Sequence, residues 1–146
     1  MEYRKGELGR VFTVRFDEGD DFLEGLTGLV IKENVRAAWF QVLGGMRNAD
    51  VVIGPKEPVM PPEPVWKELR GAFEVMGIGS IFWDKDEPKI HLHAAMGKHG
   101  ETMTSCVRKN TRVYLVLEVL IVEITGIDVS RSWYETGGFF RTTFRG

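Results

Sequence analysis

The chain has 146 residues, of which 43% are hydrophobic and 27% charged, a balance that excludes a wholly disordered or fibrous protein. Nineteen Lys and Arg residues against 21 Asp and Glu residues give a formal net charge of −2, which argues against nucleic-acid binding through a broad basic surface. The length suits one domain over residues 1–146, large enough to bury a core without disulfide bonds.

The sequence shows no export signal and no membrane-spanning segment. Residues 1–10 are charged and lack the apolar core of a signal peptide. The most hydrophobic stretch, residues 113–124, is too short to cross a bilayer as a helix and carries Glu118 and Glu123. The single cysteine, Cys106, cannot form a disulfide within one chain. We therefore expect a cytoplasmic protein without a membrane partner.

In chain order, the first predicted elements are a strand and a helix. Every second residue from Phe12 to Phe16 is apolar, which predicts a strand over residues 11–16. Asp21, followed three residues later by Glu24, is typical of a capped helix start. We expect this helix to end near Asn34. Its apolar face has offsets of four, seven and eight residues and consists of Phe22, Leu26, Leu29 and Val30.

The rest of the chain predicts strands. Five of the six prolines lie between Pro55 and Pro64, which predicts a partly extended loop. The apolar stretch 113–124 suits a long strand buried on both faces. One helix among many strands predicts an α+β domain with a largely antiparallel or mixed sheet. The expected strands cover residues 11–16, 37–43, 49–53, 66–83, 89–96, 101–107, 113–124, 130–134 and 139–144.

All three histidines and the cysteine lie between residues 91 and 106. Strand alternation places His91 and His93 on one face, where two imidazoles can share a metal ion. A His-x-His pair alone is weak support for a metal site, and a lone buried cysteine is more often a small apolar side chain. The pairing of the next strand therefore decides whether Cys106 joins the histidines.

The predicted hairpin brings Cys106 to the histidine face. If residues 97–100 form a four-residue loop, His91 lies opposite Cys106, and His93 lies opposite Thr104, which would then be a hydrogen-bonding partner of the site. A shift of one residue would turn Cys106 to the other face. The prediction therefore depends on the length of the loop.

Two imidazoles and a thiolate at His91, His93 and Cys106 suit zinc, and cobalt or nickel can occupy the same kind of site. Three protein ligands leave a fourth position open for water or a substrate, unlike most structural zinc sites. His99 is the rival third ligand, but we expect it at the loop tip, exposed to solvent.

At these residues the sequence resembles the plant-and-prokaryote conserved (PPC) domain family, as a prokaryotic single-domain member. The resemblance implies an α+β fold that assembles as a homotrimer. Prokaryotic members often carry a third histidine on the strand after the His-x-His strand, where this chain has Cys106. The matching stretches are the helix after Asp20-Asp21, residues 42–49, residues 90–97 and the apolar strand ending near Gly126, with residues 131–146 matching least.

The spacing is also similar to that of acetolactate decarboxylases, which use His-x-His followed thirteen residues later by a third histidine. Cys106 stands thirteen residues after His93. These enzymes polarise an oxygen-rich substrate on zinc with the help of carboxylates and an arginine. Arg47, Glu118 and Glu123 are available for such roles, but no motif assigns them.

These features leave three functions open. The first is a trimeric zinc-binding protein with an open metal position for a small oxygen-rich ligand, with or without catalysis. The second is a DNA-associated regulatory or protein-interaction module with a structural metal, because prokaryotic PPC relatives have been described as DNA-binding. The chain lacks the Arg-Gly-Arg core of the AT-hooks that plant members add, and its densest basic run is residues 108–112. The third is assembly alone.

Overall fold

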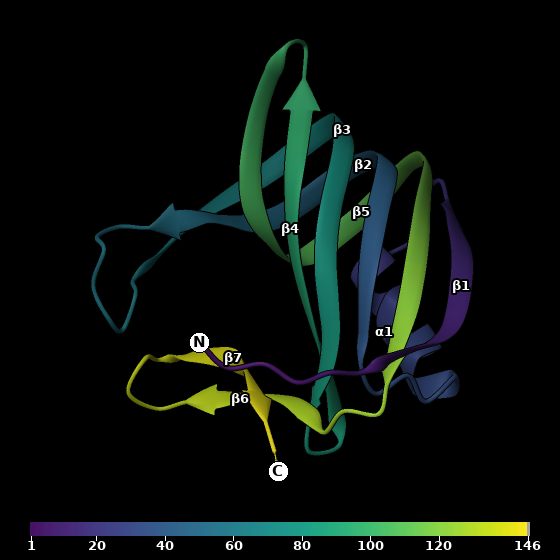
Figure 1. The fold of residues 1–146 in the computed structure, drawn as a ribbon. Helices are drawn as coiled ribbons and strands as arrows, with labels where there is room; N and C mark the ends of the chain where they lie inside the picture. Colours follow the sequence, from purple (N-terminus) through teal and green to yellow (C-terminus); the bar gives the residue numbers. More distant parts are fainter. Residues whose placement is uncertain (146) are drawn as a thin grey trace.

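The computed structural model describes residues 1–145, so that Gly146, the last residue of the expected domain, lies outside the described residues (Figure 1). Strands dominate, and the single helix has 11 residues, so the α+β class fits only loosely. Within the described residues, no helix is long and apolar enough to cross a membrane. The elements are β1 (Glu7–Asp17), α1 (Phe22–Lys32), β2 (Ala38–Pro55), β3 (Pro64–Asp84), β4 (Glu87–Lys98), β5 (Glu101–Thr125), β6 (Val129–Tyr134) and β7 (Phe139–Phe144).

The main sheet is antiparallel, as predicted, with the strand order β1-β5-β2-β3-β4. The long strand β5 pairs with β4 through its first residues and with β2 and β1 through the rest. The pairings β2–β3, β3–β4, β4–β5 and β5–β2 therefore close into a ring. The hairpin β6–β7 forms a separate two-stranded sheet beside the lower ends of β3 and β4 (Figure 1).

The helix begins where the capping pattern predicts. The Asp21 carboxylate accepts a hydrogen bond from the Glu24 N–H at 3.1 Å, which satisfies a free donor of the first turn. Thr111 on β5 donates to the same carboxylate at 3.0 Å and accepts from the Leu23 N–H at 3.0 Å, so the helix start is anchored to the sheet.

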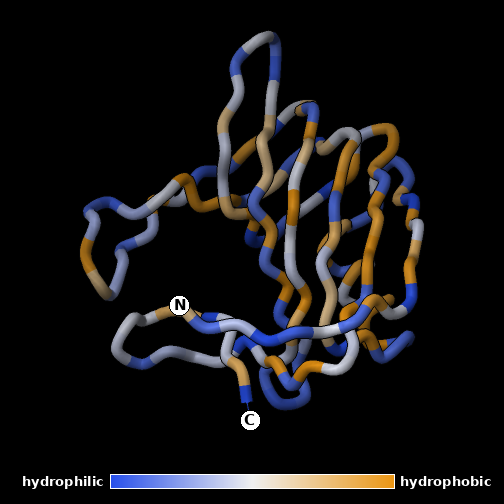
Figure 2. The backbone as a smooth tube through the Cα atoms, viewed as in Figure 1, coloured by the Kyte–Doolittle hydropathy of each residue, from blue (hydrophilic) through white to orange (hydrophobic). Residues whose placement is uncertain are grey.

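Helix α1 covers one face of the main sheet and leaves the other face uncovered. Helix α1 packs its buried Phe22 against Phe16 and Phe40, with ring centroids 5.4 Å and 6.4 Å apart. Figure 2 shows hydrophobic stretches along the strands of the sheet and a hydrophilic turn between β3 and β4. On the face away from α1, the large apolar side chains that remain exposed include Trp39, Leu43, Met76 and Ile78.

Two expectations about the strands are wrong. Residues 113–124 do form a strand, but Leu115 and Leu120 are exposed because α1 covers only one face. Strand β2 also continues through Gly44-Gly45 instead of ending there. Gly44 has φ 137°, and a Cβ at this position would lie 2.3 Å from the Val116 carbonyl oxygen, so glycine permits the close approach of β5 at an irregular register.

Candidate metal centre

The β4–β5 hairpin turns through two residues, not four. Lys98 pairs with Glu101, and the turn consists of His99 and Gly100, with φ values of 52° and 86°. Both residues occupy the left-handed region that tight hairpin turns require. The predicted loop was too long because Gly97 stays in the strand, paired with Thr102.

The shorter turn changes the partners of the site residues. Cys106 lies opposite His93, not opposite His91, and Thr104 lies opposite Ala95. The predicted hydrogen-bonding role of Thr104 beside His93 is therefore wrong. The observed register differs from the predicted one by two residues. Side chains two residues apart on a strand share a face, so Cys106 still lies on the face of the histidines.

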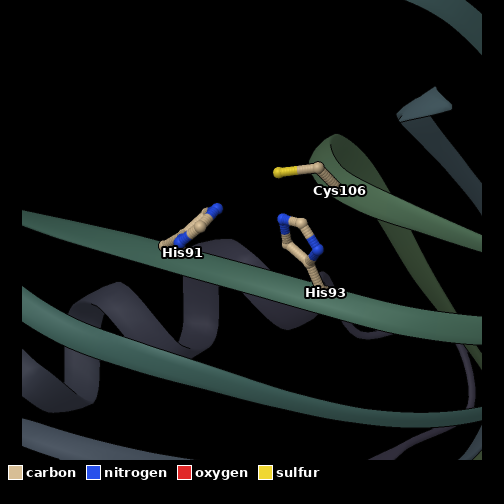
Figure 3. A group of neighbouring side chains, drawn as sticks. All are labelled: His91, His93 and Cys106. Atoms are coloured by element: carbon tan, nitrogen blue, oxygen red, sulfur yellow. The ribbon is translucent and has the colours of Figure 1, made fainter. Parts of the chain in front are cut away.

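The structure brings the side chains of His91, His93 and Cys106 together. Their potential ligand atoms all lie within 4.8 Å of one another. The two imidazole rings are 4.8 Å apart between centroids and nearly perpendicular, at 81°. Ring nitrogens and the sulfur point into a common space between β4 and β5 (Figure 3). Cys106 is buried, His91 is half-buried and His93 is exposed, so the group opens toward one side.

The donor chemistry of this group fits a transition metal such as zinc. Within residues 1–145, none of the three side chains hydrogen-bonds another residue, so their donor atoms are available. Burial, with smaller contributions in the same direction from Arg131, His93 and Arg108, lowers the pKa of His91 to about 4. His91 is therefore neutral at physiological pH, the form in which imidazole binds metals.

Cys106 needs a cation to become a ligand. Burial raises the pKa of its thiol, although the charges of Arg108 and Arg131 act in the opposite direction. The thiol is thus protonated near neutral pH when no metal is present. A divalent ion between the two imidazoles would favour the thiolate and displace the proton.

The three side chains lie in the wall of a large cavity of about 1130 Å³. One side of the cavity is formed by β3, β4 and β5, and another by the β6–β7 hairpin and the proline-rich loop that follows β2. Its lining includes four tryptophan or phenylalanine residues and four lysine or arginine residues, and it contains no aspartate or glutamate. The open side of the candidate centre therefore faces a concave, partly open space large enough for a small molecule.

The other residues considered from sequence lie elsewhere. His99 is exposed in the turn at the far end of the hairpin and does not belong to the group. Arg47 pairs with Glu18, and Glu123 pairs with Arg10 at 2.8 Å. Neither these residues nor Glu118 lines the cavity.

Two arginines of the cavity are not among the site residues predicted from the sequence, although Arg108 belongs to the basic run at residues 108–112. Arg131 on β6 and Arg108 on β5 both line it, and both act electrostatically on His91 and Cys106. A local signal existed for Arg131, because Arg131 and Trp133 are two residues apart on a short strand and share a face. No pattern in the sequence indicates that this strand lies beside β3, at the cavity that the histidine strand also lines.

The sequence profile of the Plants and Prokaryotes Conserved (PCC) domain, the family named above as PPC, matches residues 3–125. The chain therefore belongs to this family. The match includes the candidate centre and ends before β6 and β7. No curated protein sequence matches the chain significantly.

Solved structures extend the likeness over almost the whole chain. A metal-containing protein from Archaeoglobus fulgidus is 25% identical with a TM-score of 0.84, covering 97% of this chain and 98% of that one. A plant- and prokaryote-conserved (PPC) protein from Pyrococcus horikoshii is 22% identical with a TM-score of 0.82, covering 99% of both chains. A protein from Ralstonia eutropha JMP134, named as a candidate DNA-binding protein, is 18% identical with a TM-score of 0.74, covering 91% of this chain and 90% of that one.

Proposed function

We propose that the protein binds a divalent transition metal, zinc in preference to others, through His91, His93 and Cys106. The observation that carries this proposal is the approach of two imidazoles and one thiol to within 4.8 Å of one another in the wall of a cavity. The similar protein from Archaeoglobus fulgidus, named as metal-containing, supports a metal in this fold.

The proposed centre has three protein ligands and an open position toward the cavity. Nitrogen and sulfur donors favour zinc over magnesium or calcium, and cobalt or nickel can bind the same donors. When bound, such an ion supplies Lewis acidity at the cavity wall. The open position suits a small oxygen-rich ligand, in line with the thirteen-residue ligand spacing shared with acetolactate decarboxylases. The residues assign no reaction, so the proposal concerns binding.

Residues 1–146 are proposed to act as one unit, because β6 and β7 complete the cavity whose other side holds the three ligands. The PPC resemblance further predicts a homotrimer. The uncovered sheet face, with Leu43 and Met76 exposed outside the cavity, offers an apolar surface for such assembly. Native mass spectrometry tests the trimer, and a monomeric mass contradicts it. We place the protein in the reducing cytoplasm, where Cys106 stays available as a thiol.

Metal analysis of purified protein tests the centre directly. We expect about one zinc per chain in the wild type and strongly reduced metal in Cys106→Ala and His91→Ala. His99→Ala is the matched control, because His99 is an exposed histidine of the same hairpin and should leave the metal content unchanged. Unchanged zinc in Cys106→Ala would contradict the proposed ligand set.

A second candidate is a DNA-associated module with a structural metal. The name of the Ralstonia eutropha protein favours it. The exposed Arg108 and Lys109 near the cavity are the basic residues such a module would offer. A gel shift on random duplex DNA that weakens with added salt would support this function, and no shift at low salt would reject it.

A further inference from the structure

The cavity beside the candidate centre carries a strong excess of positive charge. Lys89, Arg108, Arg131 and Arg141 line it, and no acidic residue does. The chain as a whole is slightly acidic, with 21 Asp and Glu residues against 19 Lys and Arg residues. The cationic lining is therefore a local property of this cavity.

Two of these four cations are engaged by the chain itself. Lys89 forms an ion pair with Glu87 at 2.8 Å. The guanidinium of Arg141 stacks on Tyr134, with 3.9 Å between the guanidinium carbon and the ring centroid. These two side chains therefore have structural partners.

Arg131 and Arg108 have no such partners. Among residues 1–145, neither guanidinium forms an ion pair, a hydrogen bond or a ring contact. Arg131 is half-buried, and an arginine remains charged under all physiological conditions. A charge that is partly removed from water without a partner destabilises a fold, so its presence calls for a partner outside the chain.

We propose that Arg131 and Arg108 form an oxyanion-binding subsite for a small organic acid, whose carboxylate or phosphate group they hold beside the metal at His91, His93 and Cys106. This inference rests on the proposed metal centre for the second contact of the ligand, but the charge argument for the subsite stands on the half-buried Arg131, to which the exposed Arg108 adds a second cation in the same cavity. Guanidinium groups match the two oxygens of such anions with paired hydrogen bonds.

The aromatic side chains of the cavity walls also indicate the chemistry of the rest of the ligand. Trp39, Trp133 and Phe139 line the same space, and all three keep exposed aromatic surface. Apolar walls around a few convergent polar groups are typical of sites for small molecules. The preferred ligand is thus an organic acid with an apolar or planar part, not a free inorganic ion.

Calorimetric titration of the full chain tests the subsite, with benzoate and phenyl phosphate as anionic probes and benzamide as the neutral match of benzoate. Each probe is added to zinc-loaded protein and to protein stripped with EDTA. We expect at least one anion to bind at least about tenfold more tightly than benzamide. The tighter anion shows whether a carboxylate or a phosphate is preferred.

Variants assign that preference to the arginines. Arg131→Gln and, separately, Arg108→Gln are expected to weaken binding of the preferred anion about tenfold, with Arg131→Lys in between because it keeps the charge without the planar fork. Arg15→Gln on β1 is the control for the change in net charge, because Arg15 pairs with Asp17 at 2.9 Å and does not line the cavity. The folded state of each variant is checked by thermal unfolding.

The outcomes separate the two proposals. Equal binding of both anions and benzamide, or unchanged affinity in both glutamine variants, overturns the oxyanion subsite even if zinc is bound normally. Failure of wild-type protein to take up zinc overturns the proposed function, and the titrations on stripped protein then decide the subsite alone.

Discussion

Asp50 and Arg131 are both charged side chains that are wholly or partly removed from water, yet the chain surrounds them in opposite ways. Asp50 is 5% exposed, accepts a hydrogen bond from Arg70 at 2.8 Å and is also bonded by the Asn110 amide. Arg131 is half-buried, and among the described residues it has no ion pair or hydrogen bond. The first cluster, Asp50 with Arg70 and Asn110, satisfies its own charges and hydrogen bonds. The second cluster, Arg131 with Arg108 and the three candidate metal ligands, does not.

This difference indicates that the first cluster stabilises the fold and that the second is suited to binding. A buried polar cluster that satisfies its own hydrogen bonds holds strands together and needs nothing further. The candidate centre combines two imidazoles, a thiol and two cations that lack partners among residues 1–145, and none of these groups completes the others. A metal or ligand is expected to contribute where an unsatisfied polar cluster lies beside a cavity.

The largest effect is expected when a metal ion completes the group of His91, His93 and Cys106. Free zinc at a thousand times its dissociation constant should stabilise the wild type by about 4 kcal/mol, because it binds the folded chain in preference to the unfolded one. Cys106→Ala should lose most of this gain. Thermal unfolding with zinc and with EDTA measures the difference for each variant, and an equal gain in Cys106→Ala would contradict the role of the thiol.

Breaking the first cluster should have the next largest effect. Asp50→Asn removes the charge that compensates Arg70 while keeping the shape, and we expect it to lower the free energy of unfolding by about 1–3 kcal/mol. Urea denaturation measures this change. Asp17→Asn is the matched control, because Asp17 pairs with Arg15 on the exposed surface and should change stability little. Equal effects of the two variants would contradict the structural role of Asp50.

The first cluster should also make stability depend on pH. Burial raises the pKa of the Asp50 carboxyl, but hydrogen bonds from Arg70 and Asn110 and the charges of Arg70 and Lys109 outweigh burial and hold that pKa below its ordinary value. The carboxylate therefore stabilises the fold above the ordinary aspartate pKa of about 4. That stabilisation is lost as the pH falls through the lower pKa of the folded state.

Unfolding of wild type and Asp50→Asn between about pH 7 and about pH 3 measures this dependence. We expect the wild type to lose its advantage over the variant toward the acid end. A constant difference between the two proteins over the whole range would show that the charge of Asp50 does not contribute.

The smallest effect is expected at Arg131. Without metal or ligand, Arg131→Gln should lower the free energy of unfolding by no more than about 0.5 kcal/mol, because among residues 1–145 no ion pair or hydrogen bond is lost. Arg70→Gln, which does lose its partner Asp50, should be clearly more destabilising in the same urea experiment. If both variants were equally destabilised, Arg131 would have a structural role like that of Arg70, and the proposed difference between the two clusters would be wrong.

Local signals predicted much of the fold. The Asp21 cap, the alternation from Phe12 to Phe16 and the apolar face of the helix each depend on neighbours within a few residues, and each is confirmed. Alternation also placed His91 and His93 on one face. Cys106 reached that face although the loop length was wrong, because an error of two residues returns a strand to the same orientation.

What the sequence could not provide depends on contacts between distant segments. The short turn required His99 to adopt a left-handed conformation, which no pattern signalled against the four-residue alternative. The exposure of Leu120 depends on which face the helix covers. Arg131 enters the cavity only because the β6–β7 hairpin lies beside β3 and β4, and the pattern of residues 130–144 does not specify that position.

The two-residue turn between β4 and β5 has a consequence for the order in which the molecule is assembled. It joins the strands that carry His91, His93 and Cys106, so these side chains meet as soon as one tight hairpin has closed, an event of microseconds that carries little loop-closure entropy. Arg131 lies on β6, so it reaches the cavity only after β5 has formed and the β6–β7 hairpin has packed against the main sheet. We therefore expect a metal ion present during folding to find its ligands and Arg108 early, while Arg131, the other half of the proposed anion subsite, is among the last parts to reach its place.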